Sequence, residues 1–276
     1  MRSTFLGIFL ILLLTACGDD KPTPPKPQIQ VSMQPVFGGL PFYMDSIYTT
    51  QEGYKVKFSE LKCYFTLFGS GSNALHQAAL LDYRETGSLL FKKEGDYALF
   101  ANLSAILGVD SSLNHLDPSA FANESPLNIS NAGPMHWGWN PGYIFMNIEG
   151  KVDTLLDATT NPNLSFSFHI GTDTYLQNLQ FNAVNWTDIG NQTREFKLKL
   201  DLLAFLGQGV NSINLSSENL THTAAGQEAL TQKVSANFKN AISPYWWKNC
   251  WFSWAYCFYL VHVAKTKPTF SLHLMR

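Results

Sequence analysis

The chain has 276 residues with 19 Lys and Arg against 21 Asp and Glu, and 45% of its residues are hydrophobic. A net charge of −2 provides no basic field for a phosphate backbone, so composition argues against nucleic acid as a partner. The apolar content suffices for a packed core, which excludes disorder for most of the chain. The cysteines stand at positions 17, 63, 250 and 257 and form no CxxC or Cys/His knuckle, so neither a disulfide scaffold nor a closed zinc site is expected.

The N-terminal segment predicts export. Residues 1–16 have Arg2 followed by a short apolar run, which is typical of a signal peptide rather than a membrane span. The sequence Leu-Thr-Ala before Cys17 resembles a bacterial lipobox, which implies cleavage there and lipid attachment to Cys17; the alternative is an ordinary signal with a chance cysteine. Residues 17–28 form a Pro-rich tether, and its acidic pair resembles the surface-export signal of Bacteroidetes-type lipoproteins. We therefore expect an exported lipoprotein held in a membrane by its lipid, at the outer membrane or cell surface.

From residue 29 onward the pattern favours strands. Short segments rich in aromatic and β-branched residues alternate with period two and are separated by Gly, Asn, Asp and Pro. Helical periodicity is convincing only at 226–238, where Leu230, Val234 and Phe238 fall four apart. The sequence predicts a mainly β protein, a single β-sandwich domain over 29–243 with one short C-terminal helix. The expected strands lie at 30–33, 54–58, 97–100, 142–149, 164–170 and 195–201.

Polar and ligand-type residues are densest at 108–117, 126–128 and 135–143. A histidine beside carboxylates and indoles suits a metal site, a sugar platform or a capped loop. Composition alone favours the capped loop, because Asn and Asp bond their own backbone in turns.

This region and its flanks carry a series of short motifs: Leu-Leu-Asp at 80–82, Gly-Val-Asp at 108–110, Leu-Asn-His-x-Asp at 113–117, Pro-Leu-Asn at 126–128, Met-x-Trp-x-Trp-x-x-Gly-Tyr-x-Phe at 135–145, Glu-Gly at 149–150, Phe-His-Ile-Gly at 168–171, Thr-His at 221–222 and Ala-Asn-Phe at 236–238. Their order resembles that of the MbnP-like family of secreted copper-binding proteins. The resemblance runs from about residue 29 to about 242, and Cys63 stands where the family usually has tyrosine.

The resemblance implies copper binding outside the cytoplasm. In some members a tryptophan is oxidised to kynurenine by a di-haem partner protein of the cytochrome c peroxidase type, which makes Trp137 and Trp139 the candidates here. Imidazole is a suitable ligand for copper, whereas the absence of a thiolate cluster argues against a blue-copper site.

The histidines differ in how strongly the sequence supports them as metal ligands. His115 is the first candidate, with Asp117 as the acceptor that orients its second ring nitrogen, although a structural loop explains it equally well. His169 and His222 are second candidates. The alternatives are that His169 is a hydrogen-bonded histidine of the core and that His222 faces solvent. His76 and His136 are expected at the surface.

Two other functions stay open beside copper binding. A glycan-binding or adhesive module would use Trp137, Trp139, Tyr143 and Trp186 as stacking residues. A Ca²⁺ site would use Asp110, Asn114, Asp117 and Asn128, although their spacing is not that of an EF-hand. The sequence lacks a nucleophile motif, a phosphate loop and HExxH, so we do not expect an enzyme.

The tail at 244–276 differs from the rest of the chain. From Tyr245 it holds four of the seven tryptophans and no acidic residue. A membrane span is disfavoured by Lys248 and Asn249, and an added strand pair with a Cys250–Cys257 disulfide is an alternative. We favour a sequence irregularity that replaced a final strand, and we expect the tail to lie outside the fold.

Overall fold

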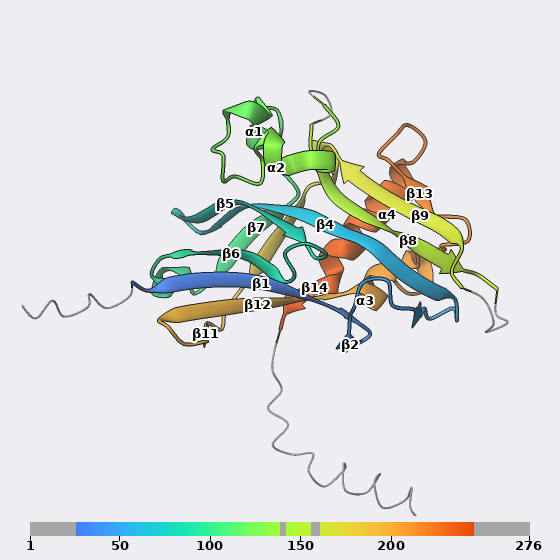
Figure 1. The fold of residues 1–276 in the computed structure, drawn as a ribbon, viewed down its shortest axis with the longest axis horizontal. Helices are drawn as coiled ribbons and strands as arrows, with labels where there is room; N and C mark the ends of the chain where they lie inside the picture. The colour runs from blue at the N-terminus through green and yellow to red at the C-terminus, as the bar shows by residue number, and fades with distance from the viewer. Residues whose placement is uncertain (1–25, 139–141, 156–160, 246–276) are drawn as a thin grey trace, which may run out of the picture.

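The computed structural model describes residues 26–138, 142–155 and 161–245. Within them, two β-sheets pack face to face, and a lobe of short helices lies on the outer face of the larger sheet (Figure 1). This confirms the mainly β single domain. Cys17, the signal peptide, Trp139 and the tail from residue 246, with its Cys250–Cys257 pair, lie outside the described residues.

The smaller sheet has six strands among the described residues. Its centre is a parallel pair made by strands from opposite ends of the fold, with Gln28 opposite Thr193 and Val36 opposite Asp201. This pairing closes the domain, since the first and last long strands stabilise each other. The strands are β1 (Gln28–Phe37), β2 (Leu40–Pro41), β6 (Leu89–Glu94), β11 (Thr187–Asp188), β12 (Thr193–Asp201) and β14 (Ile242–Pro244).

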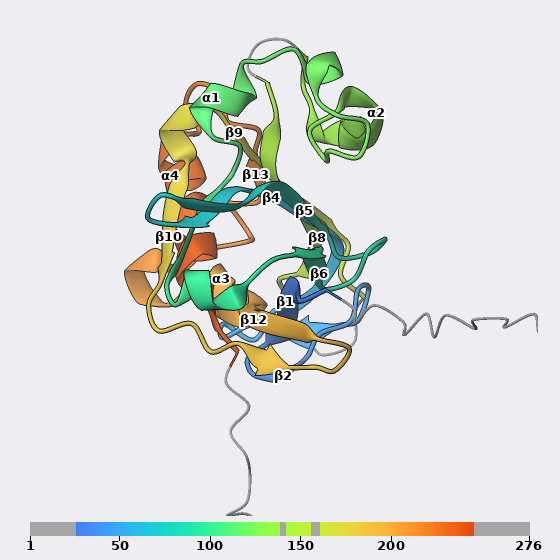
Figure 2. The same cartoon turned by 90° about the vertical axis from the view of Figure 1, so that its left-hand side faces the viewer.

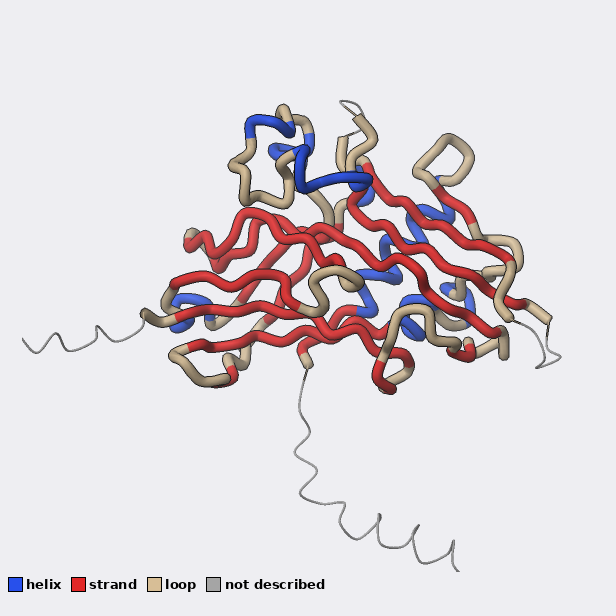
Figure 3. The backbone as a smooth tube through the Cα atoms, viewed as in Figure 1, coloured by secondary structure: helices blue, strands red, loops and turns tan. Residues whose placement is uncertain are grey.

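The larger sheet has eight strands among the described residues, and Figure 3 shows how the long ones run across the molecule. Its longest strand, β4, pairs with β5 on one side and with β8 and β7 on the other. The strands are β3 (Tyr48–Thr49), β4 (Lys55–Ser70), β5 (Asn73–Asp82), β7 (Leu103–Leu107), β8 (Ile144–Asp153), β9 (Leu164–Gly171), β10 (Gln177–Phe181) and β13 (Leu220–Thr221).

Helix α4 (Glu228–Ala241) is the predicted C-terminal helix, and it contacts strands of both sheets, beside α3 (Leu202–Leu206) (Figure 2). Val234 and Phe238 are fully buried, because the four-residue spacing points both into the sandwich. The remaining helical turns are short: α1 (Ser111–Asn114), α2 (Ile129–Ala132), η1 (Tyr97–Phe100), η2 (Pro118–Ala120), η3 (Gly133–Met135), η4 (Asp173–Tyr175) and η5 (Gly209–Asn211).

The strand prediction at 97–100 was wrong, since these residues form the 3₁₀ turn η1. The Asp96 carboxylate accepts a hydrogen bond from the Ala98 amide at 2.9 Å, which caps the turn. A four-residue segment with two aromatic residues is too short for its periodicity to distinguish a strand from a turn.

The outer face of the larger sheet is divided in two. The half beside the lobe is apolar, and the lobe covers it. There Tyr64, Phe145 and Tyr143 pack with Val109 and Leu127 in a second hydrophobic cluster. The other half carries polar side chains from β4, β8 and β9, among them Lys62, Glu149 and His169. The candidate site lies where the two halves meet.

Candidate functional site

Strand β9 presents His169 on the polar half of the outer face. Phe166, Phe168 and Ile170 point into the sandwich and are at most 1% exposed, so alternation turns Ser167 and His169 outward. His169 is half-buried, and its Nε2 lies 2.7 Å from Oε1 of Glu149 on β8. A carboxylate in this place orients the imidazole and leaves Nδ1 as the ring nitrogen that can bind a metal.

His222 lies against His169. It follows β13, which runs parallel to β9 with Thr221 opposite Phe168. The two imidazole rings stack at 4.5 Å between centroids with 7° between their planes, and Ser167 Oγ lies 3.2 Å and 3.4 Å from their Nε2 atoms. Partial burial, with the neighbouring His169 second, lowers the pKa of His222, which favours the neutral, metal-binding form.

Thr223 fixes this pair to the sheet. Its hydroxyl donates to the His169 carbonyl at 3.0 Å and accepts from the Gly171 amide at 3.0 Å. Its φ of 58° lies in the left-handed region, which is strained for a β-branched residue. The side-chain bonds offset that strain and hold His222 beside β9.

Trp137 packs on β9 next to His169. A Cβ built on Gly171 would overlap the Trp137 ring, so only glycine allows the indole to lie this close to the strand. Gly171 is two residues from His169 and therefore on the same face. Of the two tryptophans predicted for modification, Trp137 thus lies beside the histidine pair, whereas Trp139 is outside the described residues.

His115 has a different partner from the one predicted. Its exposed ring places Nε2 3.0 Å from Oδ2 of Asp173, and Asn114 Nδ2 donates to Oδ1 of the same carboxylate at 3.0 Å. Burial acts to raise the pKa of Asp173, but hydrogen bonds from Ser111, His115 and Asn114 bring it below its usual value. Nothing in the motif pattern indicates Asp173. It follows the strained Thr172 (φ 65°) in the loop after β9.

Asp117 lies elsewhere. Its Oδ1 accepts from the Ser119 amide at 2.8 Å and the Ser119 hydroxyl at 2.7 Å, so it caps η2, and these bonds lower its pKa. Asp110 and Asn128 form the same cap with Ser112 and Ser130. Three of the four residues proposed for Ca²⁺ therefore cap separate turns, as the capped-loop interpretation predicts. The oxygen of the fourth, Asn114 Oδ1, accepts from the Tyr143 amide at 2.9 Å.

Two of the stacking residues proposed for a glycan site are held by contacts within the fold. Tyr143 is 0% exposed, its hydroxyl bonds the Leu127 carbonyl, and burial raises its pKa to about 12. Trp186 packs against the main core and donates from Nε1 to the Phe100 carbonyl at 2.9 Å. The Tyr143 ring is therefore not accessible to a sugar, and the Trp186 ring is only partly exposed.

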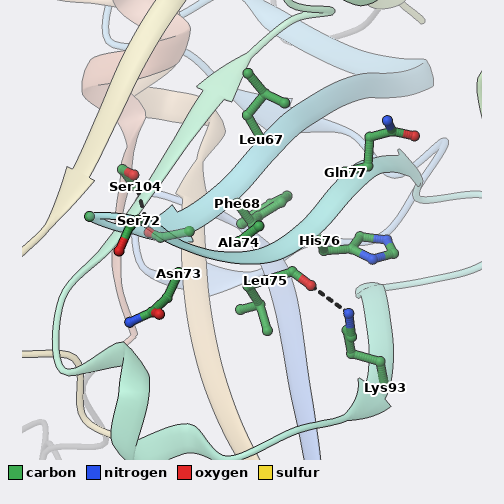
Figure 4. Close-up of a pocket in the computed structure, with 12 residues that line it drawn as sticks. Leu67, Phe68, Ser72, Asn73, Ala74, Leu75, His76, Gln77, Lys93 and Ser104 are labelled. Carbon is green, nitrogen blue, oxygen red and sulfur yellow. Dashed lines mark hydrogen bonds between the residues drawn. The ribbon is translucent and has the colours of Figure 1, made fainter.

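The two histidines expected at the surface are both half-buried. His136 Nδ1 accepts from the Gly138 amide at 3.0 Å and its ring contacts Tyr143 edge-on. His76 stacks on Phe91 at 4.2 Å beside a pocket of about 650 Å³ at the β4–β5 hairpin (Figure 4). Lys93, the cation of that pocket, already donates to the Leu75 carbonyl at 2.7 Å. The pocket therefore offers no binding site comparable to the pair of His169 and His222.

The histidine pair supplies only part of a metal site. Within the described residues, no three His, Cys, Asp or Glu side chains are grouped to hold an ion. A ligand imidazole binds a metal in its ring plane, and two nearly parallel stacked planes do not meet at one ion. Because the His222 ring is exposed, it is free to turn towards an ion held by His169.

A comparison with protein-family models agrees with the motif pattern. The MbnP family model matches residues 26–226. The solved structure of MbnP from Methylosinus trichosporium superposes with a TM-score of 0.43 at 14% identity, covering 79% of this chain and 97% of that one. No curated protein shows significant similarity to the chain.

Proposed function

The chain belongs to the MbnP family, and from that premise we propose that it is an extracytoplasmic copper-binding protein whose ion is held by His169 and His222. The observation that supports this most is the stacked imidazole pair with the Glu149 carboxylate 2.7 Å from His169 Nε2. Carboxylate–histidine pairs of this kind are typical of metal ligands, because the carboxylate fixes the tautomer and raises the basicity of the ligating nitrogen.

The chemistry of the donors suits copper. Imidazole nitrogen binds copper well, and the one cysteine within the described residues, Cys63, is fully buried in the core. Burial raises the pKa of its thiol well above the usual value, so Cys63 is no ligand. We assign the chain a binding role rather than catalysis, and we place it outside the cytoplasm as a lipoprotein anchored at Cys17.

His115 and Trp137 extend the proposal. His115 repeats the carboxylate–histidine arrangement with Asp173. Among the described residues no hydrogen bond or ring contact joins it to His169, so we rank it as a peripheral ligand. Trp137 is the tryptophan that we propose for oxidation to kynurenine, because it lies against Gly171 on the face that carries His169. The di-haem partner would be the oxidant for that step.

The test is a competition titration of the purified full chain with Cu(I) and Cu(II). Removing one imidazole of the pair, by His169→Ala or His222→Ala, should weaken copper binding on the order of 100-fold, since each loses a direct ligand. His115→Ala should change it less than fivefold. His76→Ala is the matched control, since it removes a half-buried histidine distant in the fold. Equal copper affinity in wild type, His169→Ala and His222→Ala would contradict the proposal.

A further inference from the structure

Asn147 is a buried amide whose oxygen has no partner. It lies on β8, is 7% exposed, and its Oδ1 forms no hydrogen bond within the described residues. A buried acceptor left unpaired costs free energy, so such groups are rare in folded proteins and call for an explanation.

The sheet register places Asn147 beside the histidine pair. Asn147 stands directly opposite His169 across the β8–β9 ladder and opposite Lys62 across the β4–β8 ladder. Directly opposed residues have Cβ atoms about 4.5–5.5 Å apart, within reach of a shared ion.

Neither neighbour satisfies the amide oxygen. Lys62 Nζ is engaged by Asp82 at 3.1 Å and by Glu60 at 3.3 Å. His169 turns Nε2 to Glu149 in the next row of the sheet. The nitrogen that His169 keeps for a metal and the free oxygen of Asn147 thus come from opposed positions on the same face.

We propose that Asn147 Oδ1 is the oxygen ligand of the metal held by His169 and His222, and that it selects for Cu(II) over Cu(I). This inference rests on the proposed function. It supplies the third donor that the histidine pair lacks, one that is neither His, Cys, Asp nor Glu. Amide oxygen is a hard donor, which suits Cu(II) beside imidazole and adds little for the softer Cu(I).

The Asn147→Leu variant tests this in two ways. First, it should bind Cu(II) about tenfold more weakly than wild type and leave Cu(I) binding within twofold, whereas Asn147→Asp, which keeps an oxygen, should retain most of the Cu(II) affinity. Second, metal-free Asn147→Leu should unfold at a temperature no lower than wild type, because an isosteric apolar group replaces an unpaired polar one.

Asn237→Leu is the matched control. Asn237 is also buried, at 6% exposure, but its Nδ2 donates to the Asn211 carbonyl at 2.8 Å. Its replacement should lower the unfolding temperature and leave the affinities for both ions unchanged.

The outcomes separate the two proposals. Unchanged Cu(II) affinity in Asn147→Leu while His169→Ala loses copper would overturn the role of Asn147 alone. Equal losses for both ions, or destabilisation as large as in Asn237→Leu, would also overturn it, because the amide would then be structural. A wild-type protein that binds neither ion overturns both proposals.

Discussion

At the scale of single residues, the site is built from pairs that the linear sequence does not reveal. His169, His222 and Trp137 were identifiable from motifs, and the structure places all three along β9. Their partners were not all identifiable. Glu149 belongs to a recognised motif but owes its role to strand register, whereas Asp173 and Asn147 carry no local signal, since cross-strand contacts join residues far apart in the chain.

The structure also changes the order of the candidate histidine ligands. The motif pattern places His115 first and predicts Asp117, two residues away, as its acceptor. The structure gives His115 an acceptor 58 residues away, because Asp117 bonds Ser119 within its own turn. Short-range hydrogen bonds of Asp and Asn in turns compete with longer-range roles, and here they take precedence.

His76 makes stability depend on pH. Burial, with the Lys93 charge second, lowers its pKa in the folded state to about 4 from 6.5. As pH falls below 6.5 the unfolded chain takes up the proton first, so stability falls progressively until pH reaches about 4. Between pH 7 and 5 this group should remove up to roughly 2 kcal/mol, and about half of that once solvent screening of its partly exposed ring is allowed for.

Urea unfolding of wild type and His76→Gln at pH 7 and pH 5 measures this contribution. The variant should lose less stability on acidification than wild type, since glutamine does not titrate. The same loss in both proteins would show that His76 is not the group responsible.

At the scale of elements, pattern reasoning worked where strands are long and half-buried. The predicted segments at 30–33, 54–58, 142–149, 164–170 and 195–201 fall in β1, β4, β8, β9 and β12, apart from their first one or two residues in two cases. Strand β5, with its Ala- and Leu-rich sequence, lacks a strand signal and forms through pairing with β4. The short turns of the lobe are fixed by single caps, which periodicity does not detect.

The last described strand defines where the domain ends. The predicted domain closes at residue 243, but Pro244 pairs with Leu198, and the Tyr245 amide donates to the Lys197 carbonyl at 2.8 Å. Lys197 Nζ also lies 5.4 Å from the centre of the Tyr245 ring. The domain therefore extends at least to Tyr245.

A chain that ends at Tyr245 should fold and bind copper as the full chain does. One that ends at Ser243 loses the pairing of Pro244 and the contacts of Tyr245, and should be less stable by about 1 kcal/mol. Thermal unfolding of the two truncated chains and the full chain decides this. Failure of the Tyr245-terminated chain to fold would show that the remaining tail belongs to the core.

At the scale of the whole molecule, the fold explains how one face becomes a site. The sandwich core supports the larger sheet from within, and the lobe covers the apolar half of its outer face. The histidine pair lies at the border between the covered and the polar halves. Strand β8 supplies Glu149, strand β9 supplies His169, and the strained loop after β13 supplies His222.

The N-terminal lipid anchor is a prediction for the whole protein. Within the described residues, no helix has the length and apolar character needed to span a membrane. Cys17→Ser should move the protein from the membrane fraction to the soluble fraction, because the proposed lipid is attached to that residue. Fractionation of cells that express both forms tests it, and a correctly processed variant that stays in the membrane would contradict it.

We propose above that His169 and His222 hold the copper ion together. Pulsed electron paramagnetic resonance of the Cu(II)-loaded protein detects the remote nitrogen of each coordinated imidazole and so counts the histidine ligands. We expect at least two coordinated imidazoles in wild type and one fewer in both His169→Ala and His222→Ala. Variant spectra identical to that of wild type would contradict it.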